Sequence, residues 1–230
     1  MPEQVLLSWS SGKESAIALY ELRRARSEEV VALLTTITKG YDRISMHGVR
    51  RALLEKQAKS LGLPLHEVFI PQKCSNEEYE AEMGKAMAHF QDKGISSVVF
   101  GDVLLEDVRR YRERNLARLG MRAIFPLWGM DTAELARKFI ALGFRAIVVC
   151  VDSKMLSGSF VGREFDEVFL SDLPSRVDPC GENGEFHTFV FDGPIFSRRV
   201  PFRVGKVVLR DSFYFCDLLP FTSAGTHTPA

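Results

Sequence analysis

The chain has 230 residues, 46% of them hydrophobic, so it can bury a substantial core in one domain or in one domain with a small extension. Thirty basic and thirty acidic residues cancel, which disfavours a nucleic-acid partner or an anionic membrane attracted by overall charge. The four cysteines form no Cys-x-x-Cys pair and no signal segment or long apolar span is visible, so we expect a cytoplasmic protein without zinc, iron–sulfur chemistry or membrane contact.

The first predicted strand, residues 5–9, runs into a predicted helix through a loop of small and hydroxyl side chains. The loop and the first helical turn consist of Ser10, Ser11, Gly12, Lys13, Glu14 and Ser15. Backbone N–H groups at a helix N-terminus lack partners within the helix and, together with the helix dipole, attract phosphate. The serine hydroxyls add donors and Lys13 adds a mobile cation. The segment therefore predicts a nucleotide site, against the alternative of an ordinary serine-rich turn.

Two well-known phosphate loops do not fit this segment. The P-loop of kinases and GTPases requires a glycine where Leu7 stands and a hydroxyl residue where Glu14 stands. The dinucleotide fingerprint requires three glycines, and Gly12 stands alone. The segment resembles instead the Ser-Gly-Gly-x-Asp-Ser loop of the PP-loop ATP pyrophosphatase superfamily, with Ser11 in place of a glycine and Glu14 in place of the aspartate.

Short apolar runs alternate with helical patterns over the first 150 or so positions. We predict strands at 5–9, 30–37, 65–70, 97–101, 122–126 and 145–151, and further helices at 49–61, 76–93, 107–119 and 132–142. This alternation is typical of βαβ units. The predicted fold class is therefore α/β, with a Rossmann-like parallel sheet flanked by helices.

Ligands of such sheets bind beyond the carboxyl ends of the strands, so the residues that follow each strand are candidate site residues. Thr35 lies near the end of the second strand, Gly101 and Asp102 lie at the end of the fourth and just after it, and Asp152 follows the sixth. Asp102 is a candidate magnesium ligand, because Mg²⁺ prefers carboxylate oxygens; a helix N-cap is the other interpretation. Trp128, after the fifth strand, is a candidate for stacking on a base, although core packing is the more frequent use of tryptophan.

The pattern changes after about residue 152. Residues 153–163 predict a loop, and the segment from 186 onward predicts strands or hairpins in place of further βαβ units. We therefore divide the chain into a nucleotide-binding domain at 1–152, a small C-terminal α+β lobe at 153–220 and a disordered tail at 221–230.

Residues 178–188 form a second segment whose side chains are suited to catalysis or ligand binding. Gly181 and Gly184 permit positive φ and close approach of a ligand to the backbone. Glu182 and Glu185 are candidates to bind a cationic substrate or an amine nucleophile, and His187 is a candidate to move a proton. A glycine-rich hairpin turn with solvated charges explains the same residues.

These motifs together resemble the diphthine–ammonia ligase family. The loop at 10–15 is followed by Gly101-Asp102, by Pro126-Leu127-Trp128, and by Cys-Gly-Glu-x-Gly-Glu-Phe at 180–186, and the similarity runs from about residue 4 to about residue 200. The resemblance implies an N-terminal domain that binds ATP with Mg²⁺, adenylation of a carboxylate (that of diphthine, a modified histidine of an elongation factor), and displacement of AMP by ammonia.

The residues and the resemblance together assign the expected roles. ATP binding is expected of Ser10, Ser11, Gly12, Lys13, Ser15, Thr35, Gly101 and Asp102, magnesium binding of Glu14 and Asp102, and catalysis of Lys13, Glu182, Glu185 and His187. In the segment 107–113 the chain keeps Glu113 of the Tyr-Gln-x-x-Arg-x-Glu stretch but has no glutamine, and Asn183 stands where a glycine is usual. In these departures the chain resembles bacterial relatives, so we expect the ATP chemistry with a carboxylate acceptor that is left open and can lie on a protein.

Two other functions are compatible with the sequence. A PP-loop tRNA-modifying enzyme is the nearest, although the neutral net charge and the scattered cysteines disfavour tRNA thiolation. A non-catalytic adenine-nucleotide sensor is the other, and it would not need the loop at 178–188. The base rate for oligomers makes a homodimer the default expectation.

Overall fold

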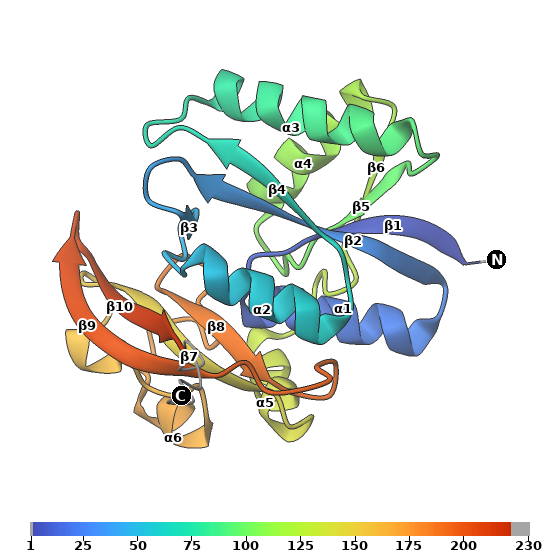
Figure 1. Cartoon of the computed structure of the whole chain (residues 1–230). Coiled ribbons are helices and arrows are strands. Elements are labelled where there is room, and N and C mark those ends of the chain that lie inside the picture. Colours follow the sequence, from blue (N-terminus) through green and yellow to red (C-terminus); the bar gives the residue numbers. More distant parts are fainter. Residues whose placement is uncertain (1, 222–230) are drawn as a thin grey trace, which may run out of the picture.

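A computed structural model of the chain describes residues 2–221 and contains two β-sheets with helices around them (Figure 1). The first sheet has six strands: β1 (Glu3–Ser8), β2 (Glu28–Thr38), β3 (Arg43–Ile44), β4 (Leu65–Ile70), β5 (Ser97–Val99) and β6 (Arg122–Ile124). Strands β4, β2, β1, β5 and β6 lie side by side and parallel, and the short β3 pairs antiparallel with the end of β2. The α/β fold with a parallel sheet is confirmed.

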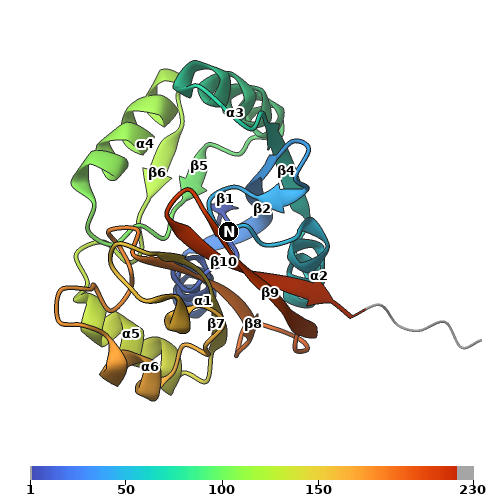
Figure 2. The ribbon, with the colours of Figure 1, turned by 90° about the vertical axis from the view of Figure 1, so that its left-hand side faces the viewer.

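Helices cover both faces of this sheet. α1 (Lys13–Ala25) and α2 (Arg51–Leu61) lie on one face, whereas α3 (Asn76–Gln91) and α4 (Glu106–Arg118) lie on the other (Figure 2). Alternate residues of a strand point to opposite faces. Val5 and Leu7 of β1 accordingly belong to the core beneath α1 and α2, and Leu6 belongs to the core beneath α3 and α4. Burial on both faces explains why these strands read as continuous apolar runs.

The second sheet has the order β8 (Phe186–Asp192), β7 (Arg145–Asp152), β10 (Phe213–Pro220) and β9 (Phe202–Arg210), and every pair is antiparallel. The predicted sixth strand exists as β7, but its placement in the parallel sheet was wrong. β8 and β10 occupy both edges of β7. Its buried run at 146–151 indicates burial on both faces and cannot indicate which sheet provides the neighbours.

The remaining elements surround the second sheet. They are α5 (Thr132–Ala141), the 3₁₀ turn η1 (Gly158–Phe160) and α6 (Glu167–Asp172). The strands and hairpin expected from residue 186 onward are confirmed by β8 and by the β9–β10 pair. The division of the chain at residue 152 stays a prediction, and the tail predicted at 221–230 lies outside the described residues apart from Phe221.

α1 and α2 lie between the two sheets (Figure 1). One continuous apolar core joins both helices to the inner face of the second sheet. Arg23 of α1 adds polar links, since its guanidinium donates to the Leu61 carbonyl oxygen of α2 at 2.8 Å and to that of Ile195 at 2.9 Å. The loop that precedes α1 also contacts the second sheet, since the Val190 N–H of β8 donates to the Ser11 carbonyl oxygen at 2.9 Å. No helix within residues 2–221 is long and apolar enough to cross a membrane.

Candidate active site

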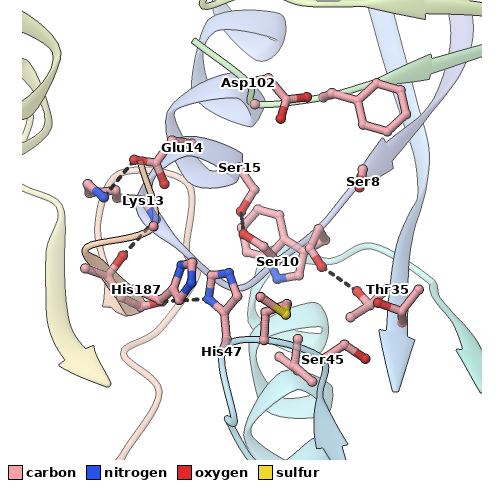
Figure 3. Close-up of a pocket in the computed structure, with 18 of the residues that line it drawn as sticks. Ser8, Ser10, Lys13, Glu14, Ser15, Thr35, Ser45, His47, Asp102 and His187 are labelled. Atoms are coloured by element: carbon pink, nitrogen blue, oxygen red, sulfur yellow. Dashed lines mark hydrogen bonds and ion pairs between the residues drawn. The ribbon is translucent and has the colours of Figure 1, made fainter. Parts of the chain in front are cut away.

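A cavity of about 340 Å³ lies at the carboxyl ends of β1, β2 and β5, beside the N-terminus of α1 (Figure 3). The loop before β8 closes one side of it. Most of the residues expected to form the site line this cavity, namely Ser10, Lys13, Glu14, Ser15, Thr35, Gly101, Asp102, Glu182 and His187. Three others, Ser11, Gly12 and Glu185, lie outside its lining. The topology rule therefore predicted correctly that these residues lie together, and their roles in binding stay predictions.

The hydroxyl groups of the loop are held in place by the loop itself. Ser10 Oγ accepts a hydrogen bond from the Gly12 N–H at 3.2 Å and lies 3.3 Å from Ser15 Oγ. Ser15 Oγ donates to the Gly12 carbonyl oxygen at 2.9 Å. Gly12 is extended and immediately precedes α1, whose first N–H groups have no acceptor within the helix. The loop thus fixes the serine hydroxyls beside the start of α1, and a helix N-terminus of this kind suits phosphate oxygens.

Ser11 shapes the loop. It adopts the left-handed conformation, with φ of 72°, at the position where the superfamily motif has glycine, and it is 0% exposed. Its carbonyl oxygen accepts hydrogen bonds from Val190 N at 2.9 Å and from Gln57 Nε2 at 3.2 Å. The serine thus keeps the turn that glycine normally provides. The expected contact of Ser11 with phosphate is corrected to this structural role, because its side chain is buried away from the cavity.

Lys13 is a buried cation. It is 2% exposed, its Nζ lies 2.7 Å from Glu14 Oε1, and it donates to the carbonyl oxygen of Cys180. The Nζ also lies 4.8 Å from the ring centroid of Phe186. Burial lowers the pKa of Lys13, but the charges of Glu14 and Glu182 outweigh burial, so this pKa lies above its usual value. The ammonium group therefore stays charged within the site.

The two glutamates of the loop at 178–188 have different positions. Glu182 lines the cavity, and its Oε2 accepts the Val103 N–H at 3.3 Å. Burial, followed by the charge of Glu14, raises the pKa of Glu182 to about 7.

Glu185 is 1% exposed and faces its own loop. Its oxygens accept hydrogen bonds from Asp178 N at 3.0 Å, Asn183 N at 2.9 Å and Asn183 Nδ2 at 3.1 Å. Because the Glu185 carboxylate is engaged there, its expected catalytic role is corrected to the positioning of the loop.

His187 is joined in the cavity by His47, which sequence reasoning did not single out. Their ring centroids are 4.5 Å apart, with the planes tilted by 30° (Figure 3). Burial, followed by the charge of Lys13, lowers the pKa of His187 to about 4, and burial together with His187 lowers the pKa of His47 as well. Both rings are therefore neutral at pH 7. The only sequence signal for His47 was its place after the second strand.

Gly101 and Thr35 contact the backbone of the phosphate loop and of the adjoining first turn of α1. A Cβ atom at Gly101 would lie 2.9 Å from the carbonyl carbon of Glu14 and 3.0 Å from Ser15 N, so glycine lets β5 approach the start of α1. Thr35 Oγ1 donates to the Trp9 carbonyl oxygen at 2.7 Å. Both residues hold the loop against the sheet.

Asp102 lies in the cavity, paired with Arg112 of α4 at 2.6 Å from Nε. It is not a helix N-cap, since the N-cap of α4 is Leu105. Within residues 2–221 no three His, Cys, Asp or Glu side chains form a ready metal centre. Mg²⁺ in nucleotide sites binds mostly to phosphates and water with one or two carboxylates. Glu14 and Asp102 fit that limited role, because both carboxylates line the cavity beside the phosphate loop.

Two positions proposed for ligand contact lie outside the cavity lining. Asp152 ends β7, which pairs with β8 and β10 in the second sheet, so Asp152 does not lie at the edge of the parallel sheet where the cavity is. Trp128 lies beneath the guanidinium of Arg109, whose Cζ is 4.6 Å from its ring, and close to the ring of Phe125. The expectation that Trp128 stacks on a base is therefore corrected to packing between β6 and α4.

Two residues that hold the site carried no sequence signal. Gln57 of α2 is 0% exposed and accepts from Trp9 Nε1 at 3.0 Å, while its Nε2 donates to the carbonyl oxygens of Ser11 and Val190. Thr188 of β8 accepts the Lys13 N–H on its Oγ1 at 3.2 Å. The loop is thus fixed from α2 and from the second sheet, both distant in sequence.

The fold and the site define a nucleotide-binding α/β enzyme of the PP-loop type. The comparisons identify its family. Residues 3–123 match the family model described as the diphthamide synthase N-terminal domain, and residues 131–217 match the diphthamide synthase C-terminal domain. The chain belongs to this family, and it is an ATP-dependent ligase.

Curated relatives carry the name diphthine–ammonia ligase. The zebrafish protein (Danio rerio) is 27% identical over 242 residues, covering 96% of this chain and 90% of its own length. The human protein is 25% identical over 209 residues, covering 86% and 78% respectively. A solved archaeal structure from Methanocaldococcus jannaschii, described as a predicted subunit of tRNA methyltransferase, covers 67% of this chain and 80% of its own at 17% identity and a TM-score of 0.39, too weak a likeness to bear on function.

Proposed function

We propose that the protein forms amides by activating a carboxylate with ATP, with release of pyrophosphate and then AMP, and with ammonia or an amine as the nucleophile. One observation supports this most directly. A phosphate loop with a buried charged lysine shares its cavity with Glu182, whose pKa of about 7 suits proton exchange with an amine. The relatives named diphthine–ammonia ligase support the same reaction class.

In the first step a carboxylate oxygen of the acceptor attacks the α-phosphorus of ATP. The bond from the α-phosphorus to the bridging oxygen breaks, and pyrophosphate leaves with the electron pair. The N-terminus of α1, the hydroxyls of Ser10 and Ser15, and the Lys13 ammonium are placed to stabilise the negative charge of the transferring phosphates. Bound Mg²⁺, held by Glu14 and Asp102, would add charge neutralisation on these phosphates.

In the second step the nitrogen lone pair attacks the acyl carbon, and the bond from that carbon to AMP breaks. Ammonium is the main form of ammonia near pH 7, so one proton must leave before the attack and a second leaves as the amide forms. The Glu182 carboxylate attracts the ammonium ion and accepts a proton, which it then passes to solvent. His187 and His47 are neutral and add no positive charge that would repel the ammonium.

The acceptor is the least constrained partner. For the relatives it is the diphthine of their printed names. For this chain we propose a carboxylate acceptor, with ATP, Mg²⁺ and ammonia or an amine as the other components, and a cytoplasmic site of action. Asn183 and the segment 107–113 are the places where this chain departs from the family motifs.

The thiol groups disfavour the tRNA-thiolating alternative. Cys150, Cys180 and Cys216 are buried, and burial raises the pKa of each thiol, to about 12 for Cys150 and about 11 for Cys216. A reactive thiolate is therefore scarce at neutral pH.

An exchange assay tests the proposal. The protein is incubated with ATP, Mg²⁺ and labelled pyrophosphate, together with single carboxylates or fractions of cell extract, and label entering ATP is measured. We expect carboxylate-dependent exchange, and AMP with pyrophosphate once ammonia is added. Stoichiometric ADP would contradict the proposal, and tight ATP binding without AMP formation under any of these conditions would indicate a nucleotide sensor.

A further inference from the structure

A second pocket, of about 180 Å³, lies between α3 and α4 and adjoins the nucleotide cavity. The two spaces share the side chains of Tyr79, Met83, Phe100 and Arg112. From Arg112 the second pocket follows α4 as far as Leu119. Seven positions of α-helix span roughly 10 Å, so the pocket is long enough for a group the size of an amino-acid side chain. The pocket has no role in the two reaction steps proposed above for the nucleotide cavity.

The wall of this pocket is mainly apolar. Met83, Met87 and Leu116 contribute to it, together with the ring of Phe100. A mostly apolar pocket with few polar groups is the usual form of a small-molecule site. One polar atom in it is unexplained, because the side-chain oxygen of Asn115 is shielded from solvent and receives no hydrogen bond from the described residues.

Arg112 stands where the pocket meets the nucleotide cavity. Its guanidinium carbon lies 4.4 Å from the centroid of the Phe100 ring, and its Nε and Nη2 face Asp102. Its Nη1 makes no hydrogen bond within residues 2–221. Arginine binds carboxylates well because its planar donors match the two oxygens. Arg112 thus offers a free donor to an anion placed at this junction.

The junction is also close to the reacting end of the site. Asp102 follows Gly101, which lies against the first turn of α1, and it precedes Val103, whose N–H donates to Glu182. The charge of Asp102 is near enough to contribute to the electrostatic environment of Glu182. A carboxylate held at Arg112 would therefore lie between the phosphate loop and the proposed proton acceptor.

Building on the proposed function, we infer that the pocket between α3 and α4 is the acceptor site: it holds the apolar body of a carboxylic acid whose carboxylate is received by Arg112. The acceptor class is then a carboxylic acid that carries an aromatic or aliphatic group of side-chain size. Small carboxylates such as acetate lack the body that fills the pocket. Neutral molecules of the same shape lack the group that Arg112 binds.

Gly84 allows the pocket to be filled without touching the nucleotide cavity. It lines the second pocket from α3, and a Cβ at this position would meet no atom within 4 Å. Leucine is also a far better helix former than glycine, so Gly84→Leu is expected to fold. Ala88→Leu, one turn further along α3 on the solvent side, adds a leucine to the same helix outside both pockets and serves as the matched control.

Calorimetric titration of the full chain with 3-phenylpropanoate, in the presence of Mg²⁺ and the non-hydrolysable analogue α,β-methylene-ATP, tests the inference. We expect wild type and Ala88→Leu to bind the probe at least tenfold more tightly than acetate or 3-phenylpropan-1-ol. Gly84→Leu should weaken probe binding at least tenfold while the affinity for the ATP analogue stays within twofold. Arg112→Gln should weaken 3-phenylpropanoate and leave the alcohol unchanged.

Equal probe binding by Gly84→Leu and wild type would overturn the inference, as would no binding to wild type or displacement of the ATP analogue by the probe. The outcome is separable from that of the proposed function. Probe binding without pyrophosphate exchange for any carboxylate would keep the carboxylate pocket and remove the ligase reaction. Exchange that proceeds equally in wild type and Gly84→Leu would keep the reaction and remove the pocket.

Discussion

Lys13 and Cys180 are 167 positions apart in the sequence, yet the ammonium group of Lys13 donates a hydrogen bond to the carbonyl oxygen of Cys180. The contact joins the first turn of α1 to the loop that carries Glu182. It means that Lys13, the proposed phosphate-binding cation, and Glu182, the proposed proton acceptor, are held by one local structure. A change at either end is therefore expected to affect both steps of the proposed reaction.

Replacing Lys13 should reduce turnover more than it reduces stability. Lys13→Met keeps an unbranched side chain against Phe165 and Phe186 but removes the charge. Loss of one preorganised group that stabilises a transition state typically lowers the rate about 10²- to 10³-fold. Pyrophosphate exchange measures this effect, with Arg24→Met on the exposed side of α1 as the control. Exchange within a factor of three of wild type would contradict the assigned role.

Gln57 should be needed for both stability and nucleotide affinity. Gln57→Met removes the hydrogen bonds to Trp9, Ser11 and Val190 and leaves buried groups unpaired. Each such group costs about 1–3 kcal/mol, so urea unfolding should show a loss of about 2–4 kcal/mol. ATP affinity should fall because the carbonyl oxygen of Ser11 then keeps only one of its two hydrogen bonds, the one from Val190 N. Lys59→Met, on the solvent side of α2, should change neither quantity.

Gly101→Ala should impair ATP binding through a backbone clash. The new Cβ would meet Glu14 and Ser15 at 2.9–3.0 Å and push the start of α1 away from β5. Gly62→Ala is a useful comparison, because it strains a positive φ at the end of α2 with no atom within 4 Å. Both variants should lose about 1 kcal/mol or more of stability. Only Gly101→Ala should lose ATP affinity, and an equal loss in both would mean that general destabilisation explains the effect.

Glu182 should make the folded state less stable as pH rises through neutrality. Its pKa is about 7 in the folded chain, against 4.5 for an ordinary glutamate. The folded state therefore binds more protons than the unfolded state between these values, and stability falls as pH rises from about 4.5 to about 7. Glu182→Gln removes this contribution. The free energy of unfolding at pH 7.5, taken relative to that at pH 5, should therefore be higher in the variant than in wild type by up to about 3 kcal/mol. Unfolding in urea at the two pH values measures it, and identical pH slopes in the variant and wild type would rule it out.

His187 should make the folded state less stable as pH falls, which is the opposite of the pH dependence expected from Glu182. Its pKa of about 4, against an ordinary 6.5, means that the unfolded state binds the proton more readily. Stability from the neutral ring is present above pH 6.5 and is lost as pH falls toward 4. His187→Gln should therefore be less sensitive to acid than wild type over this range. Thermal unfolding from pH 4.5 to pH 7 gives the comparison, and an NMR titration of His187 with a midpoint near 6.5 would contradict the premise.

The pattern around residues 5–15 predicted the phosphate loop because its information is local. An apolar run, small residues and a lysine at the start of a helix specify the turn and its donors with little help from the rest of the chain. Gly101 and Asp102 could also be placed, since parallel strands bring their carboxyl ends to one edge. For Glu182 and His187, the sequence indicated a loop with reactive side chains, and the structure put them in the cavity.

The sequence alone determined the parallel α/β layout, the phosphate loop and the family, because hydrophobic periodicity and short motifs express local preferences of the backbone. Tertiary structure decided that β7 joins the second sheet, that Glu185 faces its own loop, and that Gln57 and Thr188 hold the phosphate loop. These outcomes depend on contacts between residues that are dozens of positions or more apart, such as Gln57 with Ser11 and Lys13 with Thr188, or on which way a side chain turns within a loop. Such contacts and side-chain orientations produce no hydrophobic pattern in the sequence, so only the folded structure determines them.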